Sequence, residues 1–571
     1  MKAKITSLFP IIDTVKNYRT KLAYADASAA IIVTLMLIPQ SLAYALLAGL
    51  PPEVGLYSSI LPLIAYAIFG TSTTLAVGPV AVISLMTGAA IASLSTDMNY
   101  SPAEIAVALS FLSGLLLLAM NLLKLGFIVN FLSRSVIEGF IMASSILIIV
   151  SQLKHIIGVD AHGHALTETL SSLYQSLGDT HIPTLIMGGG ILACLLLARF
   201  LFKTVLIRFG VSGHAADLAV RMFPAFMVVI SIVVMNFTAA GETGIRVVGH
   251  IPNGLPKFQW SHLDVTLFGQ LFMPALLIAI IGYVESISVA TRFALKTKTS
   301  VEPNQELLAM GASNIASSVS GGMPVTGGFS RSVVNFDAGA KTQLSGIMAA
   351  ILIGLLASGL MTTLALLPKA TLAAAIIVAV ASLIDIKKLK ETWLFSKYDF
   401  SLTAITIVTT LLAGVEIGVS VGIVLSIILH LYHTSKPHMA VVGLVPGTEH
   451  FRNVLRQEVE TNPDIIGIRI DESLYFANAA YLEKAVVKQI IQSPRAKYCV
   501  LLFSSVNDID ASALESLESI HEKLKDMGVE LHLSEVKGPV MDKLRTTRLY
   551  GEIKEHIHLS HYQAVTHLSG L

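Results

Sequence analysis

Long apolar runs without any Asp, Glu, Lys or Arg follow one another along the first 435 residues of the chain. A membrane-spanning helix needs about 20 mainly apolar residues, and most of these runs reach or approach that length. The pattern therefore predicts an α-helical polytopic membrane protein. The charge-free runs are Ala27–Pro52, Val54–Thr96, Ile105–Leu123, Gly139–Leu153, Ile182–Ala198, Met222–Gly241, Val265–Val284, Leu307–Ser330, Thr342–Pro368, Ala370–Ile384, Phe400–Val415 and Ile417–Ser435.

Two of these runs contain an interruption and are counted as two spans each. Val54–Thr96 is too long for one span and breaks at Gly70 and at Gly78-Pro79. Leu307–Ser330 breaks at Gly321–Pro324, and we expect a second helix to begin near Thr326. The total is about fourteen spans, although hydropathy alone would also allow twelve or thirteen.

The two interruptions resemble each other in sequence and in position. Thr74–Gly88 reads TLAVGPVAVISLMTG, and Gly321–Asn335 reads GGMPVTGGFSRSVVN. Each places Gly and Pro just before a short helical segment, in about the third and the tenth span, the same rank within two seven-span halves. Matched interruptions indicate a transporter site between inverted repeats, and helix N-termini there would favour an anion. Alternatively, Gly and Pro only kink membrane helices, which is common.

Two ionisable residues accompany helix interruptions at membrane depth. Glu285 ends the run Val265–Val284, and Arg331 follows Leu307–Ser330. Such a side chain costs roughly 2.5–3.5 kcal/mol or more in a bilayer and is a functional candidate by default. The pair predicts an ion-coupled path for an anion. Alternatively, Arg331 pairs internally with Glu285, or Glu285 is a buried structural carboxylate.

Composition separates this apolar part from the C-terminal tail. The 571-residue chain is 54% hydrophobic and 13% charged, with a mean hydropathy of +0.71, whereas soluble proteins carry about 25% charged residues. From Lys436 to Leu571, by contrast, 33 of 136 residues are charged. We therefore predict a boundary near Ser435–Pro437 and three regions: an N-terminal segment (1–22), a transmembrane domain (23–435) and a soluble domain (436–571).

Basic residues before the first apolar run predict the orientation of the chain. Lys16, Arg19 and Lys21 precede that run, and positive charges favour the cytoplasmic side. We expect the N-terminus and the soluble tail to be cytoplasmic, which requires an even number of spans. The net charge of +1 gives no reason to expect a nucleic-acid partner.

The tail alternates short apolar strand patterns with amphipathic helical patterns. Its segments read DIIGIRID, NAAYLEKAVVKQIIQ, KYCVLLFSSV, ASALESLESIHEKLKDMG and VELHLSEV. Alternation of this kind predicts a small α/β domain.

Several motifs resemble the sulfate permease (SulP) family of anion transporters. The stretch MLIPQSLAYALLAGLPPEVGLYSS (Met36–Ser59) is similar to the signature of that family, and GTSTTLAVGPVAVIS, ESISVATRFA and PVTGGFSRSVVN resemble its third, eighth and tenth spans. The tail resembles the STAS domain that these transporters carry. The resemblance implies a 7+7 inverted repeat divided into core and gate domains, alternating access, and a homodimer.

The resemblance also implies a site between the N-termini of spans three and ten. Glu285 matches the acidic position that the family uses for proton or sodium coupling. Arg331 would balance the charge of an oxyanion bound by backbone N–H groups and hydroxyls. The residues implied for binding are Gln40, Tyr44, Val80, Ala81, Val82, Gly328, Phe329, Ser330 and Arg331.

Our leading hypothesis is a secondary active transporter that imports sulfate by proton symport, because a glutamate at position 285 can gain and lose a proton. Sodium-coupled bicarbonate uptake and proton-coupled dicarboxylate uptake are the closest alternatives. An uncoupled exchanger or channel would lack an acid near the site, and a sensor or scaffold function would depend on the tail. We expect no cofactor apart from the coupling ion, H⁺ or Na⁺, and a location in a bacterial inner membrane.

The tail offers weaker signals. Ser512 lies where related STAS proteins carry a phosphorylatable serine, but we favour a helix N-cap with Glu515 as its capping-box partner. His556, His558 and His561 suggest a metal only loosely, and we interpret them as a solvated surface without a metal site. HExxH and Walker patterns do not occur in the sequence, so we expect no enzyme activity. A cytoplasmic partner of the STAS domain is conceivable.

Overall fold

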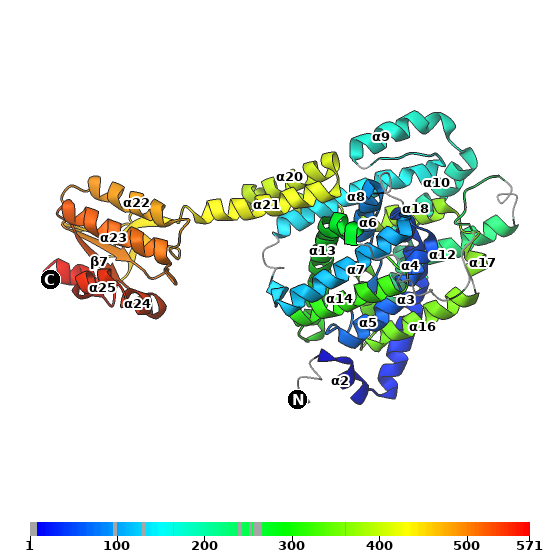
Figure 1. The fold of residues 1–571 in the computed structure, drawn as a ribbon, viewed down its shortest axis with the longest axis horizontal. Coiled ribbons are helices and arrows are strands. Elements are labelled where there is room, and N and C mark those ends of the chain that lie inside the picture. The colour runs from blue at the N-terminus through cyan, green and yellow to red at the C-terminus, as the bar shows by residue number, and fades with distance from the viewer. Residues whose placement is uncertain are drawn as a thin grey trace. The chain divides into compact units, whose positions relative to one another are not determined.

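The computed structural model describes residues 8–94, 100–127, 133–163, 165–237, 243–249, 254, 265–359 and 361–570. It contains two compact units, Met1–Val424 and Leu425–Leu571. The first unit is helical, and the second contains a sheet with helices (Figure 1). The division falls inside a helix, so the boundary predicted from charge near Ser435 remains a prediction.

Fourteen helical segments of the described chain follow the order of the predicted spans, which confirms the predicted helical membrane fold. Nine stretches are long and apolar enough to cross a bilayer, and α6 and α16 are shorter apolar helices. The segments are α3 (Thr20–Leu47), α4 and α5 (Pro52–Tyr57, Leu61–Phe69), α6 (Ala81–Leu94), α7 (Pro102–Leu122), α8 (Arg134–Ile157), α10 with its extension through α11 (Ile182–Leu197, Lys203–Arg208), α12 (Gly213–Phe237), α13 (Val265–Thr297), α14 (Pro303–Val319), α15 (Phe329–Asp337), α16 (Leu344–Gly359), α18 (Lys369–Ala381), α20 (Lys397–Ala413) and α21 (Val415–Thr434).

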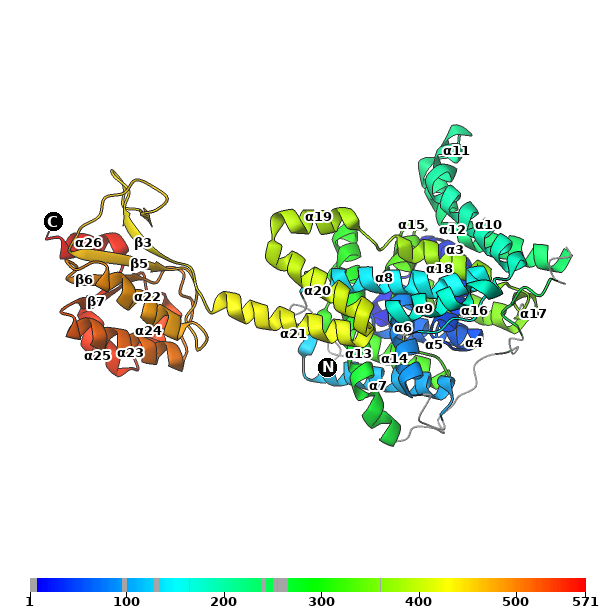
Figure 2. The same cartoon turned by 90° about the horizontal axis from the view of Figure 1, so that it is seen from above.

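These segments pack as two bundles within the first unit. In one bundle, α7 packs along α13 and α14, α5 along α14 and α16, and α3 along α16. In the other, α8 packs against α18 and α20, and α10 against α18 (Figures 1 and 2). The bundles meet where α3 contacts α12 and α18, and where α6 contacts α8. We call them the core bundle and the gate bundle.

The two interrupted segments meet inside the core bundle. Strand β1 (Val77–Gly78) precedes α6, and β2 (Thr326–Gly327) precedes α15; the two strands pair antiparallel. The prediction of a helix from Thr326 is therefore wrong by three residues, because Thr326 belongs to β2 and α15 begins at Phe329. Backbone groups outside helices need partners at membrane depth, and the strand pair provides them.

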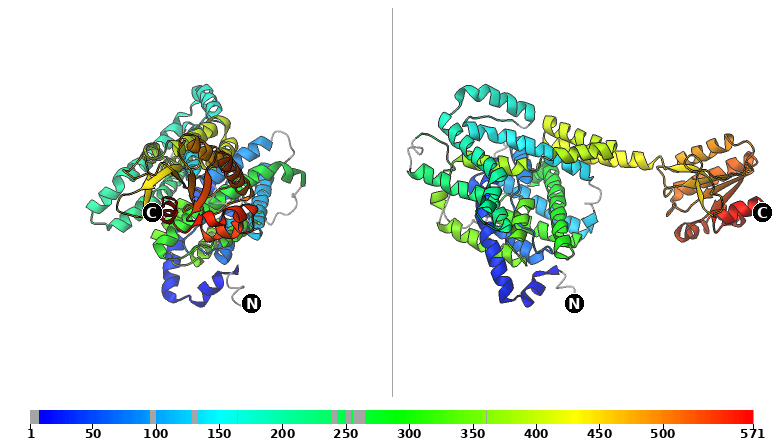
Figure 3. Two further views of the ribbon diagram at one scale, coloured as in Figure 1. Left: turned by 90° about the vertical axis from the view of Figure 1, so that its left-hand side faces the viewer. Right: turned by 180° about the vertical axis from the view of Figure 1, so that it is seen from behind.

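The second unit is a six-stranded sheet with helices on both faces, as the STAS resemblance predicts (Figure 3). Its strand order is β4-β3-β5-β6-β7-β8, with β5 to β8 parallel and β3 antiparallel to both neighbours. The elements are β3 (Met439–Leu444), β4 (Phe451–Asn453), β5 (Ile465–Ile470), α22 (Ala479–Ile491), β6 (Tyr498–Leu502), α23 (Ala511–Asp526), β7 (Glu530–Ser534), α24 (Gly538–Leu544), α25 (Arg548–Ile553), β8 (Ile557–His558) and α26 (His561–Leu568).

Two interpretations of the tail are wrong. Ser512 is not a helix N-cap, because α23 begins one residue earlier and Asp510 caps it, its Oδ1 accepting a hydrogen bond from the Ala513 N–H at 2.8 Å. His561 is not solvated. It is 1% exposed and its Nδ1 lies 2.8 Å from Ser534 Oγ, because α26 packs over the sheet.

Candidate functional site

We call the paired strands β1 and β2 the crossing. It is held in place by polar side chains of α13 and α14. Asn314 on α14 makes two hydrogen bonds to the backbone of Val325. Its Nδ2 donates to the Val325 carbonyl at 3.0 Å, and its Oδ1 accepts from the Val325 N–H at 2.9 Å. Ser286 on α13 accepts from the Gly327 N–H at 2.8 Å. These contacts attach β2 to the helix that carries Glu285, so the start of α15 has a defined position beside that residue.

Helix α15 is attached to the segment before α6 in the same way. Ser332 Oγ accepts from the Ala76 N–H at 3.0 Å, and Asn335 Nδ2 donates to the Thr74 carbonyl at 3.1 Å. The Gly328 N–H also donates to the Ala76 carbonyl, at 3.1 Å. The two interrupted segments are thus one hydrogen-bonded unit.

Two helix N-termini result from this arrangement. Helix α6 begins at Ala81, directly after β1 and Pro79, and α15 begins at Phe329. The N-cap residue of α15 is Gly328, which has no side chain to accept a hydrogen bond from the first turn. The first N–H groups of a helix lack intrahelical partners and carry the positive end of the helix dipole. Both termini therefore favour a negatively charged ligand.

Arg331 adds a full positive charge at the start of α15. The residue is 2% exposed, and its Nη1 and Nη2 have no hydrogen-bond partner among the described residues. Its guanidinium lies against two glycines: a Cβ at Gly78 would be 2.4 Å from Nη1, and one at Gly328 would be 2.8 Å from Nε. Burying a charge without partners is costly. The free donors of Arg331 therefore point to an anionic ligand, which a guanidinium binds with charge-assisted hydrogen bonds.

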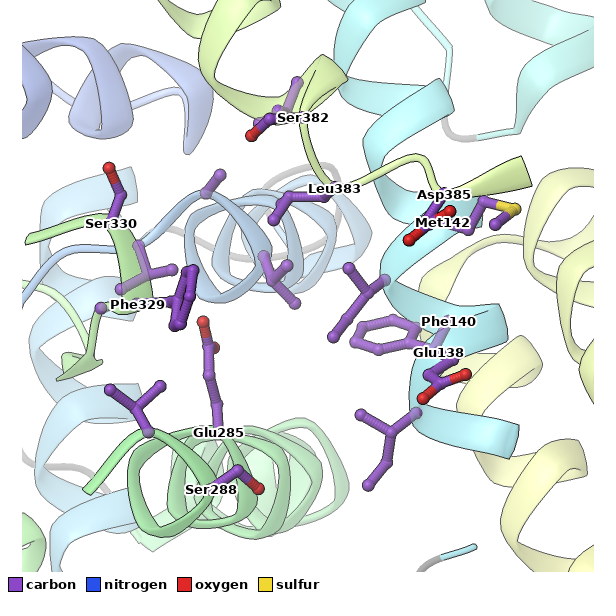
Figure 4. Close-up of a pocket in the computed structure, with 18 of the residues that line it drawn as sticks. Glu138, Phe140, Met142, Glu285, Ser288, Phe329, Ser330, Ser382, Leu383 and Asp385 are labelled. Atoms are coloured by element: carbon purple, nitrogen blue, oxygen red, sulfur yellow. The ribbon is translucent and has the colours of Figure 1, made fainter. Parts of the chain in front are cut away.

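Glu285 faces the same space from α13. Figure 4 shows its side chain extending from the helix toward the ring of Phe329. Among the hydrogen bonds and ion pairs of the described residues, none involves Glu285, so the alternative of an internal pair with Arg331 is not realised. A carboxylate without protein partners is free to exchange a proton or to bind a cation.

All ten residues predicted for substrate binding and coupling line one cavity of about 810 Å³. Val80, Ala81 and Val82 contribute from the start of α6, and Gly328 to Arg331 from the start of α15. Gln40 and Tyr44 enter from α3, and Tyr44 is 8% exposed. The cavity is lined by both bundles, because residues of α8, α12 and α18 complete its wall.

The cavity also contains residues that the sequence analysis missed. Ser288 and Arg292 follow Glu285 by three and seven positions, which places them on the same face of α13, and Arg292 Cζ lies 5.1 Å from the centre of the Phe329 ring. This helical spacing was the signal that could have identified both. Further charged residues lie at the ends of apolar runs, where charge is expected and therefore uninformative: Glu138, Arg199, Arg221, Asp385 and Lys388.

One ion pair links the core and gate bundles beside this cavity. Arg221 of α12, which lines the cavity, donates through Nη1 to Asp337 Oδ2 at the end of α15. Both side chains are about one-third exposed. Any relative movement of the two bundles in this region must break or rearrange this contact.

Comparison with known proteins gives two family matches. A model described as the sulfate permease family matches residues 24–406, and a STAS domain model matches residues 456–564. The first covers most of the helical unit and includes the whole crossing. The second falls within the α/β unit.

Similar curated proteins are plant transporters. Sulfate transporter 4.1, chloroplastic, of Arabidopsis thaliana is 35% identical over 545 residues, which are 93% of this chain and 78% of that protein. High affinity sulfate transporter 1 of Stylosanthes hamata is 30% identical over 572 residues, 96% of this chain and 84% of that protein.

Solved structures share the fold. The murine Slc26a9 anion transporter in the inward-facing state is 22% identical with a TM-score of 0.90, covering 100% of this chain and 95% of that chain. The transmembrane domain of the cyanobacterial bicarbonate transporter BicA is 21% identical with a TM-score of 0.57, covering 72% of this chain and 98% of that chain.

Proposed function

The chain belongs to the sulfate permease family, and we propose on this premise that it carries sulfate across a membrane together with protons. It is an integral multi-pass membrane protein of a family of transporters. The observation that supports the anion most directly is the buried guanidinium of Arg331, whose Nη atoms have no protein partner and lie between two helix N-termini. The printed names of the plant relatives favour sulfate as that anion.

Glu285 supports the coupling part of the proposal through electrostatics. A sulfate dianion entering the cavity is attracted by Arg331 and repelled by an ionised Glu285, both of which line it. Protonation of Glu285 removes that repulsion, so proton and sulfate each favour the binding of the other, and such coupling is reciprocal. A sodium ion beside the carboxylate would have the same effect, which is why the coupling ion requires a direct test.

Alternating access would follow from movement of the core bundle against the gate bundle. The crossing, Glu285 and Arg331 all belong to the core bundle and are tied to each other by hydrogen bonds from Ser286 and Ser332. They would move as one body with the bound anion. The Arg221–Asp337 ion pair between the bundles would form in one orientation and separate in the other.

Orientation and assembly complete the proposal. Both termini would lie in the cytoplasm of a bacterial cell, with the chain in the inner membrane, because of the basic residues before α3 and the even number of spans. The protein would act as a homodimer, and a cytoplasmic protein would recognise the STAS domain. A reporter fused after Leu571 tests the orientation: an extracytoplasmic signal would contradict it.

Uptake into proteoliposomes tests the function. The purified protein is reconstituted and given labelled sulfate, bicarbonate or fumarate under a proton gradient or, separately, a sodium gradient. We expect concentrative uptake of sulfate driven by protons alone. Sodium-driven bicarbonate uptake or proton-driven fumarate uptake would replace the substrate and ion that we propose, and equilibration without accumulation would indicate an uncoupled exchanger or channel.

A further inference from the structure

A cluster of histidines lies at one edge of the STAS sheet, away from the transport cavity. Glu530 and His532 are on β7, His558 is on β8, and His556 directly precedes β8. Leu533 pairs with Ile557 and Ser534 with His558 in parallel register. Because side chains alternate between the two faces of a strand, Glu530, His532 and His558 project from the same face, and His556 lies next to Glu530 and His532.

The ligand atoms in this cluster already lie near each other. One oxygen or ring nitrogen each of Glu530, His532 and His556 fall within 4.8 Å of one another. His532 Nε2 is 3.6 Å from Glu530 Oε2. In a tetrahedral zinc site with ligands at about 2.0–2.1 Å, two ligand atoms lie about 3.4 Å apart. The distance between His532 Nε2 and Glu530 Oε2 is therefore already close to that of a zinc site.

Two of the ring nitrogens lack any hydrogen-bond partner. His532 Nε2 and His556 Nδ1 are buried atoms without one, although the rings themselves stack with centroids 4.4 Å apart. The His532 side chain is 4% exposed, whereas that of Glu530 is 59% exposed. Buried polar atoms are normally satisfied, so two unsatisfied nitrogens beside a carboxylate indicate a ligand that accepts lone pairs.

The other nitrogen of His532 is oriented as a metal ligand requires. Its Nδ1 lies 3.1 Å from His558 Nε2. If Nδ1 donates this hydrogen bond, the lone pair of His532 is on Nε2, the atom without a partner. Ligating histidines usually donate from their second nitrogen in this way.

We propose that Glu530, His532 and His556 bind a divalent zinc ion at this edge of the STAS domain, with His558 orienting His532 and water in the fourth position. Imidazole and carboxylate ligands suit zinc, whereas calcium and magnesium take oxygen ligands. Glu530 and His556 are partly exposed and would rotate inward to close the site around the buried His532. Binding there would join β7 to β8, the edge strand of the sheet, and stabilise the C-terminal part of the domain.

Zinc titration of the full-length protein tests the site. The detergent-purified protein, with any affinity tag removed, is stripped with EDTA and titrated with Zn²⁺ against a chromophoric chelator of micromolar affinity. We expect one zinc ion per chain, a higher melting temperature with zinc than without, and visible absorption bands of a tetrahedral complex when Co²⁺ replaces Zn²⁺.

Variants at the partly exposed positions separate this site from nonspecific binding. Glu530→Gln and His556→Gln should each weaken zinc affinity about tenfold or more, and His558→Gln by 10- to 100-fold, with the metal-free melting temperature unchanged. His450→Gln is the matched control, because His450 is an exposed histidine in the β3–β4 hairpin at the opposite edge of the sheet. Failure to bind one equivalent, or equal affinity in the Glu530→Gln/His556→Gln double variant, would overturn the proposal.

Discussion

Two carboxylates on consecutive core helices, the buried Glu306 and the half-buried Glu285, have opposite surroundings. Glu306, at the start of α14, is 0% exposed and fully satisfied: its Oε1 accepts from the Thr71 N–H at 2.8 Å and from Thr71 Oγ1 at 2.6 Å, and its Oε2 accepts from Tyr66 O–H at 2.9 Å. Glu285 on α13 has no such partner and faces the cavity. Burial of a charge therefore does not by itself identify a functional residue; the informative observation is which donors the protein leaves unused.

The surroundings of Glu306 and of Glu285 also differ in whether a positively charged side chain is present. The surroundings of Glu306 are closed by neutral donors from α5 and the loop after it, so the fold alone completes its hydrogen bonds. The cavity instead pairs an unpartnered acid, Glu285, with an unpartnered base, Arg331, without bringing them into contact. Such an arrangement suits a ligand that changes during the transport cycle, because the guanidinium Nη atoms keep their hydrogen-bond donors available to that ligand.

The largest expected effect is on Arg331. Arg331→Ala should lower sulfate affinity about 100-fold, within the range of 2–5 kcal/mol for a buried charged contact, because the guanidinium adds a full positive charge to the two helix starts. Binding to detergent-purified protein measures this. The variant should remain monodisperse, since the Nη atoms make no hydrogen bonds to the described residues. Loss of expression without a selective binding defect would assign Arg331 to folding instead.

Glu285→Gln should abolish accumulation under a proton gradient. The amide resembles the protonated acid but cannot release a proton, so concentrative uptake should fall to equilibration while sulfate exchange across the membrane continues. Both rates are measured in the same proteoliposomes. Uptake at the wild-type level in this variant would show that coupling resides elsewhere.

Glu306→Ala should act on stability rather than on transport. Removing the carboxylate leaves Tyr66 O–H and the donors of Thr71 unsatisfied, at about 1–3 kcal/mol for each buried group. We expect a lower melting temperature with sulfate affinity unchanged per folded molecule. A selective loss of sulfate affinity at unchanged stability would remove the distinction drawn between the two acids.

The smallest effect is expected at the contact between the bundles. Arg221→Gln or Asp337→Asn should change the transport rate only a few-fold, because the pair is partly exposed and such pairs contribute about 0–1 kcal/mol. The charge-reversed pair Arg221→Asp/Asp337→Arg should restore the rate better than either reversal alone. If the double reversal is no better, the contact does not influence the movement.

The apolar pattern of the sequence was sufficient to predict the membrane fold and its interruptions. A charge-free run of about 20 residues indicates a helix buried in lipid. The repeated Gly and Pro before residues 80 and 329 predicted the two interrupted segments. The alternating pattern after Lys436 likewise indicated the α/β domain. These predictions succeeded because each depends on properties of a continuous stretch of chain.

The contacts of each charged or polar group, by contrast, depend on how distant segments fold together. Glu306 and Glu285 both adjoin apolar runs, yet the partners of Glu306 lie some 235 and 240 positions earlier in the chain. The strand pair of Val77 and Gly327, and the meeting of His532 with His556, likewise join segments distant in sequence. Hydrogen bonds and ligand sets depend on distances of a few ångströms between such segments, and local composition carries no record of those distances.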